Sequence, residues 1–222
     1  MGELKIGSYN IKTGVMVKYN MPLIANDITS LGLDIVGFQE IDQFTTRSGG
    51  IDTVKLLCEA TGYKYGMFSR AIDYKGGQYG TAILSRYPIK SFEVIQLDAG
   101  SFEGRSAGHT VIDVNGVSID FFNTHLSYES TVLRSGQFSQ LAGLLKKCGT
   151  FILTGDFNTE VTSEFSVIEN SSIVNKNTYP TFPSTGKGID NIILSKDWSV
   201  VSSGMGPAGH SDHNLLWAEI RQ

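Results

Sequence analysis

The chain has 222 residues, of which 41% are hydrophobic and 18% are charged, and its formal net charge is −4 at pH 7. These values are typical of a soluble globular protein and argue against intrinsic disorder. The length is compatible with one α/β domain, residues 1–222, which would bury about 70% of the surface that the unfolded chain exposes. The acidic balance disfavours a nuclease that holds long duplex DNA through a basic face.

Segments rich in Ile, Val and Phe predict nine β-strands. In chain order they lie at about residues 4–10, 34–39, 80–85, 90–97, 107–114, 117–124, 150–155, 190–194 and 213–220. Helical periodicity predicts three helices between them, over 22–31 after the expected cap Asn20, over 52–61 with Asp52 at its start, and over 131–147. The sequence shows no linker or repeat, so this order favours an α/β sandwich of two packed mixed sheets with helices outside.

Cys58 and Cys148 are the only cysteines, and a single pair gives no disulfide framework. We therefore expect buried, reduced thiols. The opening residues lack the apolar region of a signal peptide, and no apolar run approaches membrane-spanning length, so no membrane insertion is expected. If the termini are native we expect a cytoplasmic monomer; removal of a signal peptide would instead allow a secreted or periplasmic protein.

The most informative segment follows the strand predicted at 150–155. Thr154-Gly155-Asp156-Phe157-Asn158 places an acid and an amide two residues apart at a strand end, where alternation brings them to one face. A carboxylate there can orient or deprotonate a water, and an amide can donate to developing negative charge on oxygen. These residue types are also common in ordinary turns, so the segment alone decides nothing.

Other polar clusters also lie at the ends of apolar runs or within them. They are Ser8-Tyr9-Asn10, Gln39-Glu40, Asn123-Thr124-His125, Ile189-Asp190-Asn191 and Ser211-Asp212-His213. Strand ends that meet at one edge of a sheet form a natural ligand site. The clusters together therefore predict one polar site built from several strands.

In their order along the chain these motifs, with Tyr79-Gly80-Thr81-Ala82-Ile83-Leu84-Ser85-Arg86-Tyr87-Pro88 between them, resemble those of the endonuclease/exonuclease/phosphatase superfamily, which includes deoxyribonuclease I. The resemblance runs from Ser8 to His213. It implies a deoxyribonuclease I-like, four-layer α/β sandwich and a Mg²⁺-dependent hydrolase of phosphoesters, with phosphodiesters favoured and Mn²⁺ as a substitute metal. A catalytically silent module that binds phosphate ligands is the alternative.

Oxygen ligands suit Mg²⁺. Glu40 is the best candidate ligand, and the resemblance adds Asn10 and Asp212. The chain has no Cys/His spacing typical of zinc sites.

The resemblance also assigns catalytic roles. It pairs His213 with Asp190, as general base or as electrostatic support for the transition state, and it assigns His125 to the phosphate or the leaving group. Asp156 is our candidate for activating the attacking water, and Asn158 for donating to a non-bridging oxygen. Which histidine is the acid and which the base stays open.

The substrate is less defined. Arg105, Arg86, Tyr79 and Arg47 are candidates for phosphate or substrate binding, although Arg86 could equally anchor the sheet in its turn. Nucleic acid, a lipid headgroup or a small molecule all remain open as substrates. The family often has Arg before and Tyr after the Ile-Asp pair, whereas Gly188 and Asn191 stand here, which weakens any transfer of substrate contacts. His109 and His210 have no motif support, and we expect them to be a packing residue and a loop residue.

Overall fold

A computed structural model describes residues 2–222, whose strands form two six-stranded mixed sheets. In spatial order, the first sheet contains β11 (Ser199–Met205), β12 (Leu216–Arg221), β1 (Leu4–Asn10), β2 (Ile35–Gln43), β4 (Gly77–Ser85) and β3 (Tyr65–Tyr74). The second contains β5 (Ile89–Leu97), β6 (Arg105–Val114), β7 (Val117–His125), β8 (Phe151–Asp156), β10 (Asp190–Ser195) and β9 (Ser171–Ile173).

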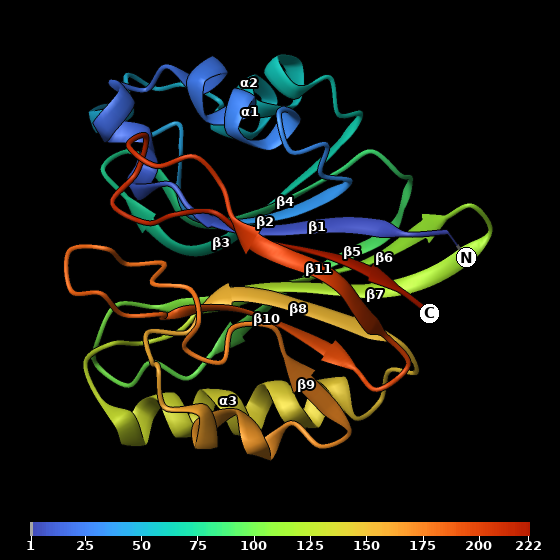
Figure 1. Ribbon diagram of the computed structural model, residues 1–222. Coiled ribbons are helices and arrows are strands. Elements are labelled where there is room, and N and C mark those ends of the chain that lie inside the picture. The colour runs from blue at the N-terminus through green and yellow to red at the C-terminus, as the bar shows by residue number, and fades with distance from the viewer. Residues whose placement is uncertain (1) are drawn as a thin grey trace.

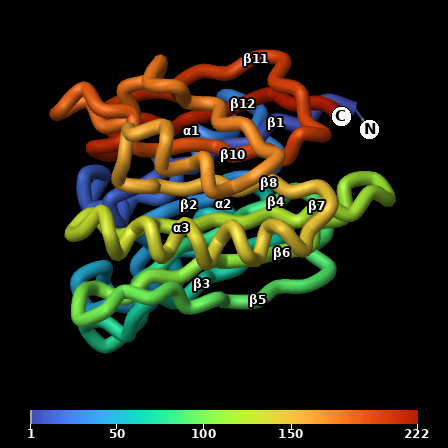
Figure 2. Tube along the Cα trace, turned by 90° about the horizontal axis from the view of Figure 1, so that it is seen from below, coloured from blue at the N-terminus to red at the C-terminus, as the bar shows by residue number. Residues whose placement is uncertain are grey.

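The two sheets stack face to face and the helices lie outside them (Figure 1). Helices α1 (Met21–Thr29) and α2 (Thr53–Thr61) cover the first sheet, and α3 (Thr131–Leu145) lies across the outer face of the second (Figure 2). Three 3₁₀ segments complete the structure: η1 (Lys12–Val17), η2 (Thr46–Ser48) and η3 (Thr162–Val167). The predicted four-layer α/β sandwich is confirmed.

Each layer boundary is filled by one apolar cluster. Ile35, Ile83, Phe121 and Ile152 belong to the cluster between the sheets, and each is fully buried. A second cluster lies under α1 and α2, and a third lies under α3. Burial of the apolar faces of both sheets is the main favourable term in this fold.

The helices follow the predicted boundaries closely. The Asp52 side chain caps α2 by accepting a hydrogen bond from the Lys55 backbone, and Gly62 ends this helix with φ of 73°. Asn20 occupies the N-cap position of α1, but its side chain makes no capping hydrogen bond, so that part of the prediction is wrong. Helix α3 ends at Leu145, two residues before the predicted end.

Three strands were not predicted: β3, β9 and β11. Strand β3 pairs with β4 through a tight turn at Lys75 and Gly76, which have φ of 43° and 77°. Strands β3, β9 and β11 are all edge strands, and none of them is fully buried. An edge strand packs fewer neighbours and needs less apolar sequence, so its pattern is weak.

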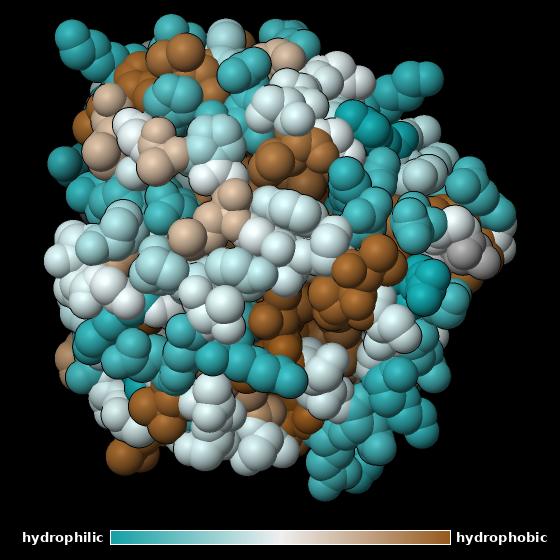
Figure 3. All heavy atoms as spheres, viewed as in Figure 1, coloured by the Kyte–Doolittle hydropathy of each residue, from teal (hydrophilic) through white to brown (hydrophobic). Residues whose placement is uncertain are grey.

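The two cysteines differ from the prediction in their burial. Cys58 and Cys148 are both free, as predicted, but each is only partly buried, whereas burial was predicted. Hydrophobic side chains at the surface gather in small areas of a face that is otherwise hydrophilic or neutral (Figure 3). Among residues 2–222, no helix is long and apolar enough to cross a membrane.

Candidate active site

The polar motifs meet at one edge of the sandwich because of the strand directions. Strands β1 and β2 are parallel in one sheet and β7 and β8 are parallel in the other, so Asn10, His125 and Asp156 end their strands at this edge. Strand β10 runs antiparallel to β8 and starts at Asp190. The start of β1 and the end of β12 lie at the opposite end of the strands (Figure 1).

A buried polar layer joins the two sheets beneath this edge. The Asn123 amide donates to the backbone carbonyls of Phe38 and Ala82, at 2.8 and 2.9 Å, and accepts from Gln39 Nε2 at 2.7 Å. A Cβ atom at Gly37 would collide with Asn123 and Thr154 in this layer, so a glycine is required there. The layer fixes one sheet against the other, and therefore fixes the relative positions of the site residues.

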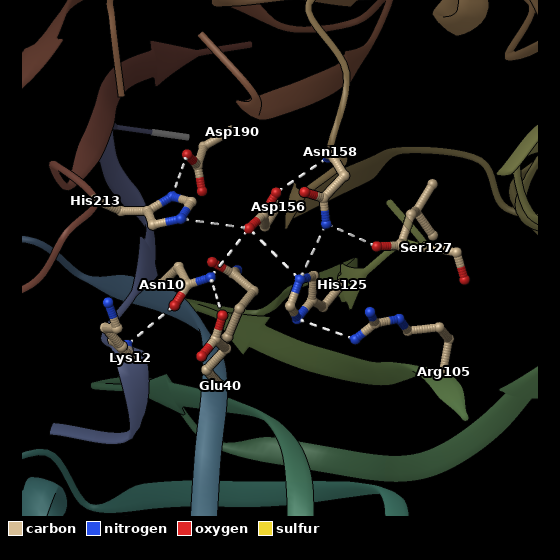
Figure 4. Close-up of polar contacts among 12 residues, drawn as sticks. Asn10, Lys12, Glu40, Arg105, His125, Ser127, Asp156, Asn158, Asp190 and His213 are labelled. Carbon is tan, nitrogen blue, oxygen red and sulfur yellow. Dashed lines mark hydrogen bonds and ion pairs between the residues drawn. The ribbon is translucent and has the colours of Figure 1, made fainter. Parts of the chain in front are cut away.

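Asp156 lies at the centre of the site (Figure 4). It is 2% exposed, and its Oδ2 accepts from Asn10 Nδ2 at 3.0 Å while its Oδ1 accepts from the Asn158 backbone at 3.0 Å. Asp190 lies directly opposite it in the antiparallel β8–β10 pair, so two buried carboxylates face each other. Like charges in such a pair are destabilising unless a cation lies between them.

His213 provides that cation. Its Nδ1 lies 2.8 Å from Asp190 Oδ2, and its Nε2 lies 3.7 Å from Asp156 Oδ2. Burial lowers the pKa of His213, but Asp190 first, and then Asp156 and Asp212, raise it more, to about 10. The imidazole is therefore positively charged at neutral pH in the metal-free protein.

The loop that carries His213 is tied to the end of β1. Ser211 Oγ donates to the Asn10 carbonyl at 2.7 Å and accepts from the His213 backbone at 3.3 Å. The Phe182 ring packs against the imidazole at 4.8 Å between centroids. His210 lies in the same loop, as predicted, and its Nδ1 is 3.0 Å from the buried Asp27.

Glu40 reaches the site from a bulge in β2. The register against β4 shifts between Phe38 and Ile41, and Glu40 itself has φ of 55°. A residue with a side chain rarely adopts this left-handed conformation, and such strain is concentrated at functional sites. Its Oε1 accepts from Asn10 Nδ2 at 3.0 Å, and burial raises the pKa of Glu40. One amide group of Asn10 therefore holds the Glu40 and Asp156 carboxylates together.

The other two predicted metal ligands are differently engaged. Asn10 presents its amide nitrogen to the carboxylates, while its Oδ1 accepts from the Lys12 backbone at 3.0 Å. Asp212 pairs with Lys12 Nζ at 2.7 Å. Their metal roles stay predictions. The tight group of potential ligands in this region is instead Asp156, Asp190 and His213, whose ligand atoms lie within 4.8 Å of one another.

His125 lies on the other side of Asp156. Its Nε2 is 3.1 Å from Asn158 Nδ2 and 3.5 Å from Asp156 Oδ2, and its Nδ1 faces Arg105 at 3.5 Å. Burial, and then the charges of Arg105 and His213, hold the pKa of His125 well below its usual range. The two histidines are therefore in opposite charge states at neutral pH. Asn158 Nδ2 also donates to the Leu126 carbonyl at 2.9 Å.

A cleft of about 350 Å³ opens beside Glu40. Lys12, Arg47, Tyr74, Tyr79 and Glu103 are among its lining residues. The guanidinium of Arg47 pairs with the buried Asp42 at 2.5 and 2.8 Å and lies over the rings of Tyr74 and Tyr79, at 4.6 and 5.7 Å. Tyr79 and Arg47 both line this cleft, and their contact with substrate stays a prediction.

The other two arginines predicted to bind phosphate lie in different parts of the structure. Arg105 is 3% exposed and lies next to His125, with Glu103 accepting from its Nη1 at 2.8 Å. Arg86 instead pairs with Asp34, the residue before β2, and stacks on Tyr63 at the far end of the sheet from Glu40. Its position does not support the predicted phosphate contact and favours the alternative, an anchor for the sheet.

Sequence reasoning did not find Lys12, Tyr74 or Glu103. Lys12 follows the Tyr9-Asn10-Ile11 motif by one residue, and this proximity was the only available signal. Tyr74 and Glu103 approach the cleft from the β3–β4 hairpin and from the loop before β6. Only the packing of separate loops brings them together.

A strand-end site between two stacked sheets defines a class of protein, the deoxyribonuclease I-like α/β sandwich. The sequence profile of the Endonuclease/Exonuclease/phosphatase family matches residues 7–213, and the chain belongs to this family. No curated protein was matched by sequence.

Several solved structures share the fold. An endonuclease/exonuclease/phosphatase from Beutenbergia cavernae DSM 12333 has a TM-score of 0.87 at 20% identity, covering 100% of this chain and 72% of that one. A mannosyl-6-phosphatase from Bacteroides thetaiotaomicron VPI-5482 has a TM-score of 0.76 at 18% identity, with 99% and 100% covered. TDP2 from D. rerio, in complex with a single-strand DNA product, has a TM-score of 0.77 at 16% identity, with all of both chains covered.

Proposed function

We propose that this protein is a Mg²⁺-dependent hydrolase of phosphoesters that favours phosphodiesters. The observation that carries the proposal is the position of Asp156, which lies between the protonated His213, itself paired with Asp190, and the Asn10–Glu40 pair. A base, a cation and a second carboxylate within reach of one point are the groups that hydrolysis of a phosphate ester needs. Family membership supports the same chemistry.

The residues present fit a hard divalent cation. Glu40 is a largely buried carboxylate, and among residues 2–222 it forms no salt bridge with any Lys, Arg or His. A buried carboxylate without a cationic partner is costly, and the bound ion would remove that cost. Glu40 would hold the metal, and Mn²⁺ would substitute for Mg²⁺. The ion would supply charge stabilisation for the phosphate oxygens.

Asp156 is the group that would orient and deprotonate the attacking water. Burial and then Asp190 raise its pKa, to about 7, against the opposing effects of His213, Asn10 and the Asn158 backbone. A general base works best when its pKa lies near the working pH, because it is then both ionised and basic enough. The Asn10 amide and the Asn158 backbone fix the direction of its lone pairs.

His213 and His125 would take different roles. His213 carries a proton at neutral pH, so it suits donation to a non-bridging oxygen on which charge develops, rather than proton abstraction. His125 is neutral and lies beside Asn158 and Arg105, where its ring can contact the phosphate or the leaving group. The Asn158 amide already contacts His125 and the Leu126 carbonyl, so its donation to substrate would require exchange of one of these partners.

The charge balance of the cleft supports a diester over a monoester. Lys12, Arg47 and Arg105 each pair with a carboxylate, of Asp212, Asp42 and Glu103. A diester carries one negative charge and a monoester carries close to two at neutral pH, so a site whose cations are largely neutralised suits the diester better. The aromatic wall of Tyr74 and Tyr79 would hold the esterified group. Nucleic-acid ends, lipid headgroups and small phosphodiesters all present such a group.

The test compares bis-p-nitrophenyl phosphate with p-nitrophenyl phosphate, each with Mg²⁺, with Mn²⁺ and with a chelator. We expect metal-dependent cleavage that prefers the diester and is lost in Asp156→Asn and His213→Gln. Arg86→Ala is the matched control, because it removes a charged side chain away from the site. Cleavage that persists in Asp156→Asn would refute the assigned site. Absence of turnover on both substrates and on DNA, with metal binding intact, would favour the silent binding module.

A further inference from the structure

A second cluster of ligand-type side chains lies outside the active site, on the side of the second sheet that faces α3. It consists of His109 on β6, Asp120 on β7 and Cys148 in the turn between α3 and β8. Asp120 is five residues before His125 on β7, which places it roughly 17 Å along the strand from the catalytic edge. The cluster takes no part in the proposed hydrolysis.

The three side chains converge on one point. His109 Nε2 lies 2.7 Å from Asp120 Oδ1, and one ligand atom from each of His109, Asp120 and Cys148 lies within 4.8 Å of the others. The Cys148 thiol also donates to the Leu144 carbonyl, at 3.7 Å, and Cys148 packs against the apolar cluster under α3. Around a tetrahedral Zn²⁺ the ligand atoms lie about 3.3–3.8 Å apart, given metal–ligand bonds of about 2.0–2.3 Å. Small side-chain rotations would bring the three groups to those positions.

A fourth residue holds the His109 imidazole in the orientation that a metal-binding histidine needs. Glu93 on β5 pairs with His109 across the strands, and its Oε1 lies 2.8 Å from His109 Nδ1. A ligating histidine typically gives its other N–H to a carboxylate, which sets the tautomer and leaves the ligating nitrogen with a lone pair. The ring is also held flat against Phe122, with 4.1 Å between centroids and 3° between planes.

The position of His109 between the Glu93 and Asp120 carboxylates requires a positive charge. A neutral imidazole has one N–H and cannot satisfy two carboxylates, so either a proton or a metal ion must lie between His109 and Asp120. Stacking on Phe122 agrees with the packing role predicted for His109, but packing alone does not explain the two carboxylates that the imidazole contacts. A thiolate, an imidazole and a carboxylate form a mixed donor set that prefers Zn²⁺ over Mg²⁺.

We propose that His109, Asp120 and Cys148 form a binding site for a transition-metal ion, preferably Zn²⁺, with Glu93 as the residue that positions the imidazole. Asp120 and Cys148 would contribute one negative charge each and balance the ion. The cluster is partly exposed, with 17% of the His109 side chain and 26% of the Asp120 side chain accessible, so water can enter as the fourth ligand. The bound ion would join β5, β6 and β7 to the turn before β8 and stabilise this side of the sandwich.

The experiment uses Co²⁺ as a spectroscopic substitute for Zn²⁺. The full chain is freed of metal, excess Mg²⁺ is added to occupy the active site, and Co²⁺ is titrated in. We expect one equivalent to produce thiolate-to-cobalt charge-transfer absorption, which added Zn²⁺ removes. The catalytic site contains no cysteine, so this signal reports the new site alone.

Single substitutions test the role of each residue in the proposed metal site. Cys148→Ser is expected to abolish the absorption and the rise in Tm that Zn²⁺ gives, while Cys58→Ser, the other partly buried thiol, keeps both. Glu93→Gln is expected to weaken Co²⁺ binding by about 10–100-fold without removing the charge-transfer band. Magnesium-dependent hydrolysis in Cys148→Ser shows that this variant is folded. Absence of the band in the wild-type protein, or its persistence in Cys148→Ser, would overturn the proposal.

Discussion

The Asp190–His213 pair provides the most stringent test of the site, through the substitution Asp190→Asn. The asparagine keeps the shape of the side chain, and its Oδ1 can still accept from His213 Nδ1, which now lies 2.8 Å from Asp190 Oδ2. Only the negative charge is lost. Asp190 is the largest of the influences that raise the pKa of His213, whereas burial of the imidazole lowers it.

The expected size of the effect of Asp190→Asn follows from the pKa of His213. A rise from 6.5 to about 10 corresponds to roughly 5 kcal/mol in favour of the imidazolium, at about 1.4 kcal/mol per unit. Without the Asp190 charge, only Asp156 and Asp212 oppose the effect of burial, and we expect the pKa of His213 to fall below 7. At pH 7.5 the variant would then hold a neutral His213, and turnover would drop by roughly 100-fold or more, as for the loss of a positioned proton donor.

The assay is NMR of the imidazole nitrogens in protein labelled at histidine, recorded with a chelator from pH 5 to 10. The chain has four histidines, and His213→Gln assigns the signal by its absence. In the wild-type protein His213 should stay protonated at pH 8.5; in Asp190→Asn it should be neutral there. A wild-type His213 that titrates near 6.5, or a variant His213 that titrates above 9, would refute the reasoning.

Three further predictions concern the metal, stability and the sheet anchor. Glu40→Gln should raise the Mg²⁺ concentration for half-maximal turnover by about 10-fold or more in a metal titration, because the ion loses a charged oxygen ligand. The pKa of His213 is higher in the folded protein than in the unfolded chain, so its stabilising effect is fully present below pH 6.5 and is lost as the pH rises toward 10. This group should therefore lower the free energy of unfolding of the metal-free protein by up to about 1.4 kcal/mol per pH unit between pH 7 and 9, and urea unfolding that is equally stable at both pH values would contradict it. Arg86→Ala should cost at most about 1 kcal/mol by the same unfolding assay, because its pair with Asp34 is exposed, and should leave kcat unchanged; a large loss of kcat would restore Arg86 to the phosphate site.

The sequence alone was enough to predict the fold and the group of motifs at one edge of the sheets. Strands β2 and β8 begin with continuous apolar runs, and β1 and β7 end in buried segments, so the polar residues that end these strands stand out. The edge strands β3 and β11 carry mixed residues and gave no such signal.

The details of the site depend on conformations that a residue pattern does not contain. Glu40 and Asn158 both adopt left-handed backbone conformations, with φ of 55° and 52°, where alternation would have predicted ordinary extended strands. The separation of Arg86 from Arg105 also required the structure. Both are arginines next to predicted strands, but one lies at the catalytic edge and the other at the far end of β2.

The central groups of the candidate site are held in a state that folding alone would not favour. Strand pairing sets Asp156 opposite Asp190, and both are buried, so the two negative charges oppose folding unless something positive lies next to them. His213 supplies one positive charge to this pair, and Glu40 on the other side of Asp156 adds a carboxylate that burial makes harder to ionise. The four groups therefore remain short of positive charge at neutral pH. This deficit is the physical reason to expect that the protein gains stability from a divalent cation at the place where the proposed hydrolysis would require one.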